Sequence, residues 1–173
     1  MNKYIIDANV VLLSGTPVKE IPQDQLLCAK KCFDFIKKFM ENSDSNLVLD
    51  AEGRILKEYR GAGTLGGSPN MATMFCKWAH QNMPKDAEDF ISLEETRENV
   101  FAVYPDSEKL KTFDPPDRKY IALAYAHLQK PPIVEASDSK WWGIHKELEE
   151  NGVKVLFIDE DYIKKKYMQK IGV

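Results

Sequence analysis

Short apolar segments that each end in an acid recur along this chain, and they constrain its fold more than any other feature. The clearest pairs are residues 4–6 with Asp7, residues 47–49 with Asp50, and residues 133–136 with Asp138. Runs rich in Ile, Val and Leu are typical of buried strands, and helical periodicity fills the stretches between them. Strands that alternate with helices favour a mainly parallel sheet with both faces covered. The sequence therefore predicts an α/β fold, a three-layer α/β/α sandwich.

Helical periodicity is strongest over residues 26–41, where apolar residues recur at spacings of three and four. Weaker patterns predict further helices over residues 52–60, 73–82, 93–99 and 115–128, after Asp138 and after residue 158. Residues 61–70, GAGTLGGSPN, lack the Gly-Lys-Ser/Thr ending of a phosphate-binding loop, so they predict a mobile connection or a substrate lid. Trp141 and Trp142 are neighbours in a predicted helix, so their rings point about 100° apart and cannot be equally buried.

The composition predicts one globular domain over residues 1–173. With 43% hydrophobic residues, a chain of this length can bury a substantial core. The formal net charge is −3, so any contact with a polyanion must be local. No apolar run approaches the roughly 20 residues of a membrane span, the first residues lack a signal-peptide pattern, and the three cysteines form no Cys-x-x-Cys pair. We expect a cytoplasmic protein that does not contact the membrane.

Asp7 is the first candidate for a functional site, because it follows a predicted strand at the edge where open α/β sheets bind ligands. The alternative is that it only caps the next helix. After the second strand, Asp50, Glu52 and Glu58 compete for one role. Capping explains Asp50 and the helix dipole explains Glu52, whereas Glu58 lies late in its helix, where the dipole disfavours an anion. Glu58 is therefore the stronger candidate of the three.

Two further acids begin the helix predicted after residue 113. Asp114 before Pro115 fits an N-cap followed by proline at the first helical position, which places Asp117 at the third position. Capping alone would select both acids. Asp138 then follows the third apolar strand and repeats the pattern of Asp7.

Four of these acids, taken in order, resemble the PIN-domain nucleases, a family that includes the ribonuclease toxins of bacterial toxin-antitoxin pairs. The matching residues are Asp7 after IID, Glu58 in GRILKEYR, Asp117 in DPPDRKYIALAYA and Asp138 in EASDSKWW. The resemblance spans residues 4–158. It implies a PIN-like sandwich in which the four acids gather at one end of the sheet and bind Mg²⁺ or Mn²⁺. It also implies a metal-dependent endoribonuclease with a toxin, RNA-processing or defence role.

The same resemblance assigns neighbours and partners to the site. Asn9 and Ser137 become polar neighbours of the acids. Many relatives carry another acid two residues beyond the fourth, where this chain has Lys140, so a second metal ion is expected to bind weakly or only with substrate. The implied partners are RNA rather than DNA, an antitoxin or another protein, and a second copy of the chain in a homodimer.

General chemistry agrees with a metal site. Carboxylates within about 4 to 6 Å of one another raise each other's pKa unless a cation neutralises them, and oxygen ligands suit Mg²⁺ or Mn²⁺ better than Zn²⁺. Arg60, Arg118 and Lys119 lie beside the acids in the sequence. They are candidates for contacts with the phosphate backbone of the substrate.

Two other function classes compete with a nuclease, and the residues count against the first of them. A phosphotransfer enzyme would use an aspartyl nucleophile at Asp7, but the haloacid-dehalogenase pattern requires a second Asp where this chain has Asn9, and a receiver requires paired acids at that site. A catalytically inactive PIN-like module that binds RNA or protein would retain the acids as caps. Binding of Mn²⁺ that depends on Asp7 separates this module from a nuclease. The sequence leaves open whether Asp50, Glu52 or Asp114 also belongs to the site.

Overall fold

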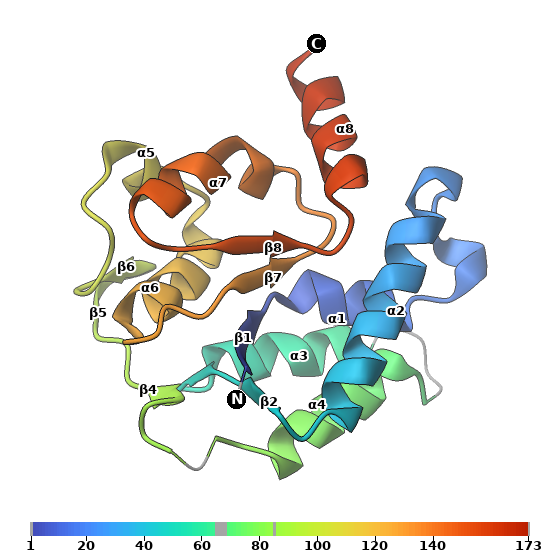
Figure 1. Cartoon of the computed structure of the whole chain (residues 1–173), viewed down its shortest axis with the longest axis horizontal. Coiled ribbons are helices and arrows are strands. Elements are labelled where there is room, and N and C mark those ends of the chain that lie inside the picture. Colours follow the sequence, from blue (N-terminus) through green and yellow to red (C-terminus); the bar gives the residue numbers. More distant parts are fainter. Residues whose placement is uncertain (1, 65–68, 85, 173) are drawn as a thin grey trace.

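The computed structural model describes residues 2–64, 69–84 and 86–172 and shows a mixed α/β fold around a four-stranded sheet (Figure 1). The strand order is β2-β1-β7-β8, and all neighbouring pairs in this sheet are parallel. Its strands are β1 (Asn2–Ile6), β2 (Ser45–Leu47), β7 (Ile133–Glu135) and β8 (Val155–Phe157). The mixed α/β class and the parallel sheet predicted from the sequence are confirmed.

The helices form two groups that follow the two halves of the chain. They are α1 (Ala8–Gly15), α2 (Leu26–Glu41), α3 (Arg54–Thr64), α4 (Met71–Gln81), α5 (Glu108–Lys111), α6 (Arg118–Ala126), α7 (Lys140–Glu150) and α8 (Glu160–Ile171), with short 3-10 turns η1 (Val18–Glu20), η2 (Gln23–Gln25) and η3 (Pro115–Asp117). Helices α1 to α4 contact one another and lie on the side of β1 and β2, whereas α5 and α7 lie on the side of β7 and β8 (Figure 1). Within the described ranges, no helix combines the length and the apolar character needed to cross a membrane.

The second predicted strand is divided between two sheets. Residues up to Leu47 belong to β2, and Val48 still donates its N–H to the Tyr4 carbonyl oxygen. The chain then turns away, and β3 (Leu49–Asp50) pairs in parallel with β4 (Phe90–Ile91). Asp50 is therefore carried away from the edge of the main sheet.

The helix predicted over residues 93–99 is wrong, because residues 95–101 form an antiparallel hairpin. Its strands are β5 (Glu95–Arg97) and β6 (Val100–Phe101). Asn99 closes the turn in the left-handed region, with φ of 56°, and donates its N–H to the Glu95 side chain at 2.5 Å. Local side-chain to backbone bonds of this kind compete with helix formation.

The segment predicted as a mobile connection or lid is partly helical, because α3 continues to Thr64. Residues 65–68 of that segment lie outside the described residues. The prediction for Trp141 and Trp142 is confirmed. Trp141 is fully buried against the Phe113 ring, with centroids 5.0 Å apart, whereas Trp142 is partly exposed.

The order of the main sheet reverses between β1 and β7. The connection from β1 leads through α1 and α2 to β2 on one side, and the connection from β7 leads through α7 to β8 on the other. Ligands of open α/β sheets bind at the carboxyl edge where the order reverses. Asp7 follows β1 and Glu135 ends β7, so two acids lie at this point of the sheet.

Candidate active site

Asp7 caps α1 and is almost completely buried, with 5% of its surface exposed. Its Oδ1 accepts hydrogen bonds from the Asn9 backbone N–H at 2.9 Å and from Asn9 Nδ2 at 2.8 Å. The alternative raised by the sequence, that Asp7 caps the next helix, is therefore confirmed. The cap does not account for Glu135, whose Oε2 accepts from the same Asn9 Nδ2 at 2.9 Å and whose carboxyl group is therefore close to that of Asp7.

Asn9 links the ends of β1 and β7. Its Nδ2 also donates to Glu135 Oε2 at 2.9 Å, and its Oδ1 accepts from the backbone N–H groups of Ala136 and Ser137 at 3.2 and 3.4 Å. All of its side-chain polar groups are thus used in positioning two acids and the turn after β7. The sequence predicted Asn9 and Ser137 as polar neighbours of the acids, and the structure brings both of them to this turn.

Glu135 is fully buried and was not selected from the sequence. Its Oε1 accepts from the backbone N–H groups of Ala136 at 2.9 Å and Asp138 at 3.0 Å. In the sequence, Glu135 is marked only as an acid within an otherwise apolar strand. Its burial depends on α1 packing over the end of that strand, which the sequence does not show. The structure adds Glu135 to the candidate site.

The acids at this edge have raised pKa values. Burial raises the pKa of Asp7 well above its usual range, and the adjacent charge of Glu135 raises it further. Burial likewise raises the pKa of Glu135 to about 7. Two carboxyl groups in contact cannot both ionise at low cost, so without a cation this pair retains a proton near neutral pH.

A second group of acids surrounds the ammonium group of Lys140 at the start of α7. Lys140 Nζ contacts Asp114 Oδ2, lies 3.0 Å from Asp138 Oδ2, and lies 3.5 Å from Asp117 Oδ2. These three carboxylates raise the pKa of the lysine, so it remains charged. Lys140, at which this chain departs from the PIN-domain pattern, therefore pairs with two of the four acids that the resemblance selected, Asp117 and Asp138.

Asp117 joins the two groups of acids. Burial raises its pKa to about 6, in opposition to the nearby positive charge of Lys140. Its negative charge in turn contributes to the raised pKa of Asp7. Neither Asp114 nor Asp117 makes a side-chain capping bond, so capping does not explain this pair.

Glu58 faces the site from α3. Its Oε2 accepts from the Tyr120 hydroxyl at 2.5 Å, and its Oε1 lies 2.6 Å from Lys119 Nζ. The Tyr120 oxygen also accepts from the Ala8 N–H at 3.2 Å, one residue after Asp7. Glu58 is thus tied to the end of β1 through Tyr120 and does not point into bulk solvent. Tyr120 is a second residue that the sequence analysis missed.

The competing acids Asp50 and Glu52 have structural roles. Asp50 is fully buried and accepts from the Arg54 and Ile55 N–H groups in the first turn of α3, at 2.8 and 2.9 Å. Glu52 accepts from the Ser92 hydroxyl at 2.6 Å and pairs with Arg54 at 2.7 Å. Their bonds lie within or beside α3 and away from Asp7.

The three predicted cations differ in what they contact. Lys119 is buried, and its ammonium group donates to the Pro116 carbonyl oxygen besides its pair with Glu58. Arg60 is exposed on α3. Arg118 donates from Nε to the Phe113 carbonyl oxygen at 2.8 Å and is only partly buried.

The acidic side chains at this edge are of the type that binds a hard cation, but they are not grouped closely enough to hold one as they stand. Asp7, Glu135, Asp117 and Asp138 offer carboxylate oxygens, which suit Mg²⁺ or Mn²⁺. Over the described ranges, no three acidic, histidine or cysteine side chains are grouped closely enough to hold a metal ion as they stand. Lys140 already pairs with Asp117 and Asp138, so a cation that bound these two carboxylates would compete with its ammonium group.

No family model matches this chain, and searches of curated proteins and of solved structures find no match either. The resemblance to PIN-domain nucleases therefore stays a prediction, and the function has to be argued from the site.

Proposed function

We propose that this protein is a Mg²⁺- or Mn²⁺-dependent nuclease with a PIN-like three-layer α/β/α arrangement, and that it cuts RNA rather than DNA. The observation that carries the proposal is that two buried carboxyl groups, those of Asp7 and Glu135, accept from the same Asn9 Nδ2 at 2.8 and 2.9 Å at the carboxyl edge of the sheet. Folding places two repelling acids in a buried position, which costs stability. Such arrangements are typical of functional sites, where the strain serves binding or catalysis.

A divalent cation relieves this repulsion directly. When bound, it would lower the pKa of a water molecule and stabilise the charge that builds on a phosphodiester. Asp7 and Glu135 would hold it, and Asp117 and Asp138 would join them after Lys140 moves. Asn9 keeps the first two carboxyl groups in place through bonds to both, at 2.8 and 2.9 Å. Glu58 and Tyr120 join α3 to the start of α1, because Tyr120 hydrogen-bonds to both Glu58 and the Ala8 N–H.

The test compares Asp7→Asn with Asp50→Asn in Mn²⁺ titration calorimetry and in cleavage of single-stranded RNA. Asn keeps one oxygen acceptor, so Asp7→Asn retains the helix cap while it removes the charge. We expect this variant to lose Mn²⁺ binding and at least 100-fold in cleavage rate while it stays folded. Asp50→Asn is the matched control, and its folded fraction should bind Mn²⁺ as the wild type does. Mn²⁺ binding and cleavage that survive in Asp7→Asn would contradict the proposal.

A second candidate function is a catalytically inactive module that binds RNA or protein. The observation that favours it is Lys140, whose ammonium group already pairs with Asp114, Asp117 and Asp138. In such a module the acids form a permanent ion-pair network and need no metal. The titration separates the two functions, because the module shows no Mn²⁺ binding at neutral pH and no Mn²⁺-dependent rise in thermal stability.

A further inference from the structure

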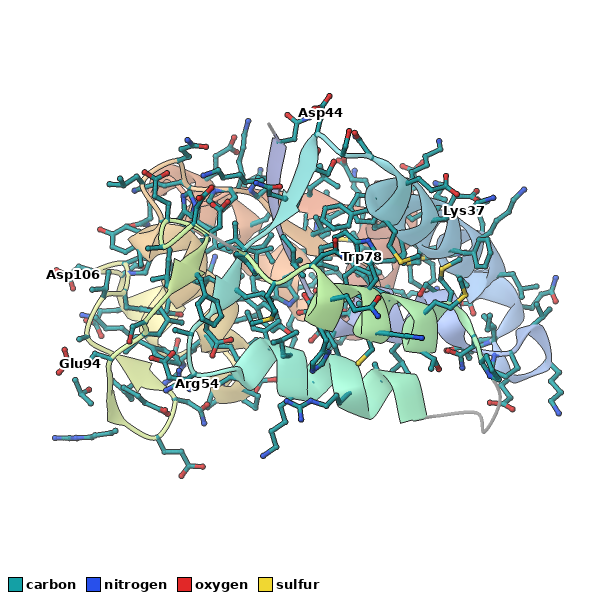
Figure 2. The ribbon with its side chains drawn as sticks, turned by 90° about the horizontal axis from the view of Figure 1, so that it is seen from below. Lys37, Asp44, Arg54, Trp78, Glu94 and Asp106 are labelled. Carbon is teal, nitrogen blue, oxygen red and sulfur yellow. The ribbon has the colours of Figure 1, made fainter. Side chains whose placement is uncertain are left out.

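A cavity of about 370 Å³ lies between the β5–β6 hairpin and the start of α6, outside the group of acids. Its wall includes Phe101, Ala102, Tyr104, Lys111 and Arg118. Figure 1 shows β5, β6, α5 and α6 together at one side of the molecule, away from α2. Figure 2 shows Asp106, at the rim of this cavity, on the outer edge opposite Lys37 of α2. The cavity is large enough for a small organic ligand.

Arg118 is the charged residue of this wall that has no acidic partner. Its Nε donates to the Phe113 carbonyl oxygen at 2.8 Å, which fixes the guanidinium group. No ion pair joins it to any carboxylate among the described residues. Lys111, in contrast, is held by Asp106 at 2.7 Å and by Glu108 at 3.0 Å, so the acid at the rim is already neutralised. A fixed guanidinium group without a counter-ion is suited to a phosphate, which it can bind with two N–H donors.

The rest of the wall offers rigid aromatic surface. The Tyr104 ring is partly exposed, and its hydroxyl donates to the Leu110 carbonyl oxygen at 3.1 Å, so the ring is fixed in orientation. Phe101 lines the same cavity, and the Arg54 guanidinium carbon lies 5.7 Å from its ring centroid. A partly exposed ring of fixed orientation is a surface on which a nucleobase can stack, whatever the base.

We propose that this cavity binds one unpaired nucleotide, with its base against Tyr104 and its phosphate on Arg118. Arg118 directly follows Asp117, so the phosphate would lie beside the candidate active site. The proposal rests on the proposed function only in naming RNA as the source of the nucleotide. The cavity would then favour single-stranded over paired substrate, because a paired base can enter it only after the free-energy cost of unpairing and unstacking.

The test uses the metal-free protein and adenosine 5′-monophosphate, measured by titration calorimetry with EDTA present. Arg118→Gln should weaken binding at least tenfold, which corresponds to about 1.4 kcal/mol. Ala102→Phe fills the cavity from an exposed position and should abolish binding of the monophosphate and of adenosine. Arg97→Gln, which removes an exposed charge from the same hairpin, is the control and should change nothing. Circular dichroism checks that all three variants are folded.

Cleavage assays then separate this inference from the proposed function. If the protein is a nuclease, Arg118→Gln and Ala102→Phe should raise KM for single-stranded RNA at least tenfold and change kcat little. Monophosphate binding that depends on Arg118 in a protein without Mn²⁺-dependent cleavage would support the cavity and overturn the nuclease. Active cleavage with unchanged KM and unchanged monophosphate binding in both variants would overturn the cavity and leave the nuclease.

Discussion

Asp7 and Asp50 look alike in sequence but differ in what surrounds them. Each follows a short apolar strand, each is buried, and each accepts hydrogen bonds from the first turn of the next helix. Asp50 uses both oxygens for N–H groups and has Arg54 3.6 Å away. Asp7 uses one oxygen for Asn9 and shares the Asn9 Nδ2 donor with Glu135, a second buried acid.

The difference lies in whether the protein compensates the buried charge. The charge on Asp50 is compensated by two backbone N–H donors and a nearby guanidinium group. The charge on Asp7 is opposed by burial and by Glu135, so it destabilises the fold until a proton or another cation is bound. A buried acid that stays uncompensated is the stronger sign of a binding site.

The largest expected effect on stability belongs to Asp50. Asp50→Asn replaces one of two accepting oxygens by an NH₂ group that faces a backbone N–H donor, and it removes the charge beside Arg54. We expect a loss of about 2 to 3 kcal/mol in the free energy of unfolding, typical of a broken buried bond to a charged group. Urea denaturation followed by circular dichroism measures it. A loss no larger than that of Asp7→Asn would break the comparison.

Asp7→Asn should instead stabilise the metal-free protein, and the gain should depend on pH. The folded-state pKa values of Asp7 and Glu135 are raised, the latter to about 7, whereas both are near 4 in the unfolded chain. From pH 4 upward the folded protein therefore binds more protons than the unfolded chain, and its stability falls as pH rises toward the folded-state pKa values. We expect Asp7→Asn to match the wild type near pH 4 and to exceed it by about 1 to 2 kcal/mol at pH 7.5.

Thermal or urea unfolding at several pH values measures this gap. Mn²⁺ should stabilise the wild type at pH 7.5 and close the gap, because it binds only the charged pair. Asp7→Asn that is less stable than the wild type by about 2 kcal/mol or more at neutral pH would make Asp7 a purely structural cap like Asp50.

The smallest expected effect is on Mn²⁺ affinity, and it concerns the cation that pairs with each group of acids. Lys140 contacts three carboxylates, and Arg54 contacts Asp50, Glu52 and Glu95. Lys140→Met should tighten Mn²⁺ binding about tenfold, or about 1.4 kcal/mol, because it removes a competing charge. The metal-free protein should lose at most about 1 kcal/mol, since the lysine side chain is 35% exposed.

Arg54→Met is the matched control for that substitution. It removes a charge from an equally acidic group, but the oxygens of Asp50 remain occupied by the N–H groups of α3. No Mn²⁺ affinity should appear at this position. Equal changes in Mn²⁺ affinity in the two variants would show that local charge alone, and not the arrangement around Asp7, controls binding.

The sequence by itself determined the mixed α/β class, the parallel sheet and the amphipathic helix α2. Periodicity carries this information, because apolar residues repeat every two or every 3.6 positions according to the element that they form. The resemblance to PIN-domain nucleases selected Asp7, Glu58, Asp117 and Asp138. The structure places Asp7 beside Asn9, Asp117 and Asp138 beside Lys140, and Glu58 on Tyr120. Periodicity failed at residues 93–99, where a left-handed Asn99 closes a hairpin.

Only the tertiary structure separated Asp7 from Asp50 and added Glu135. The split of one apolar run into β2 and β3 carries Asp50 to a different sheet, and no local pattern encodes that division. Glu135 becomes unusual only when α1 closes over the end of β7 and leaves it fully buried beside Asp7. Burial and charge contacts arise between residues far apart in the chain, so they are decided when the elements pack together.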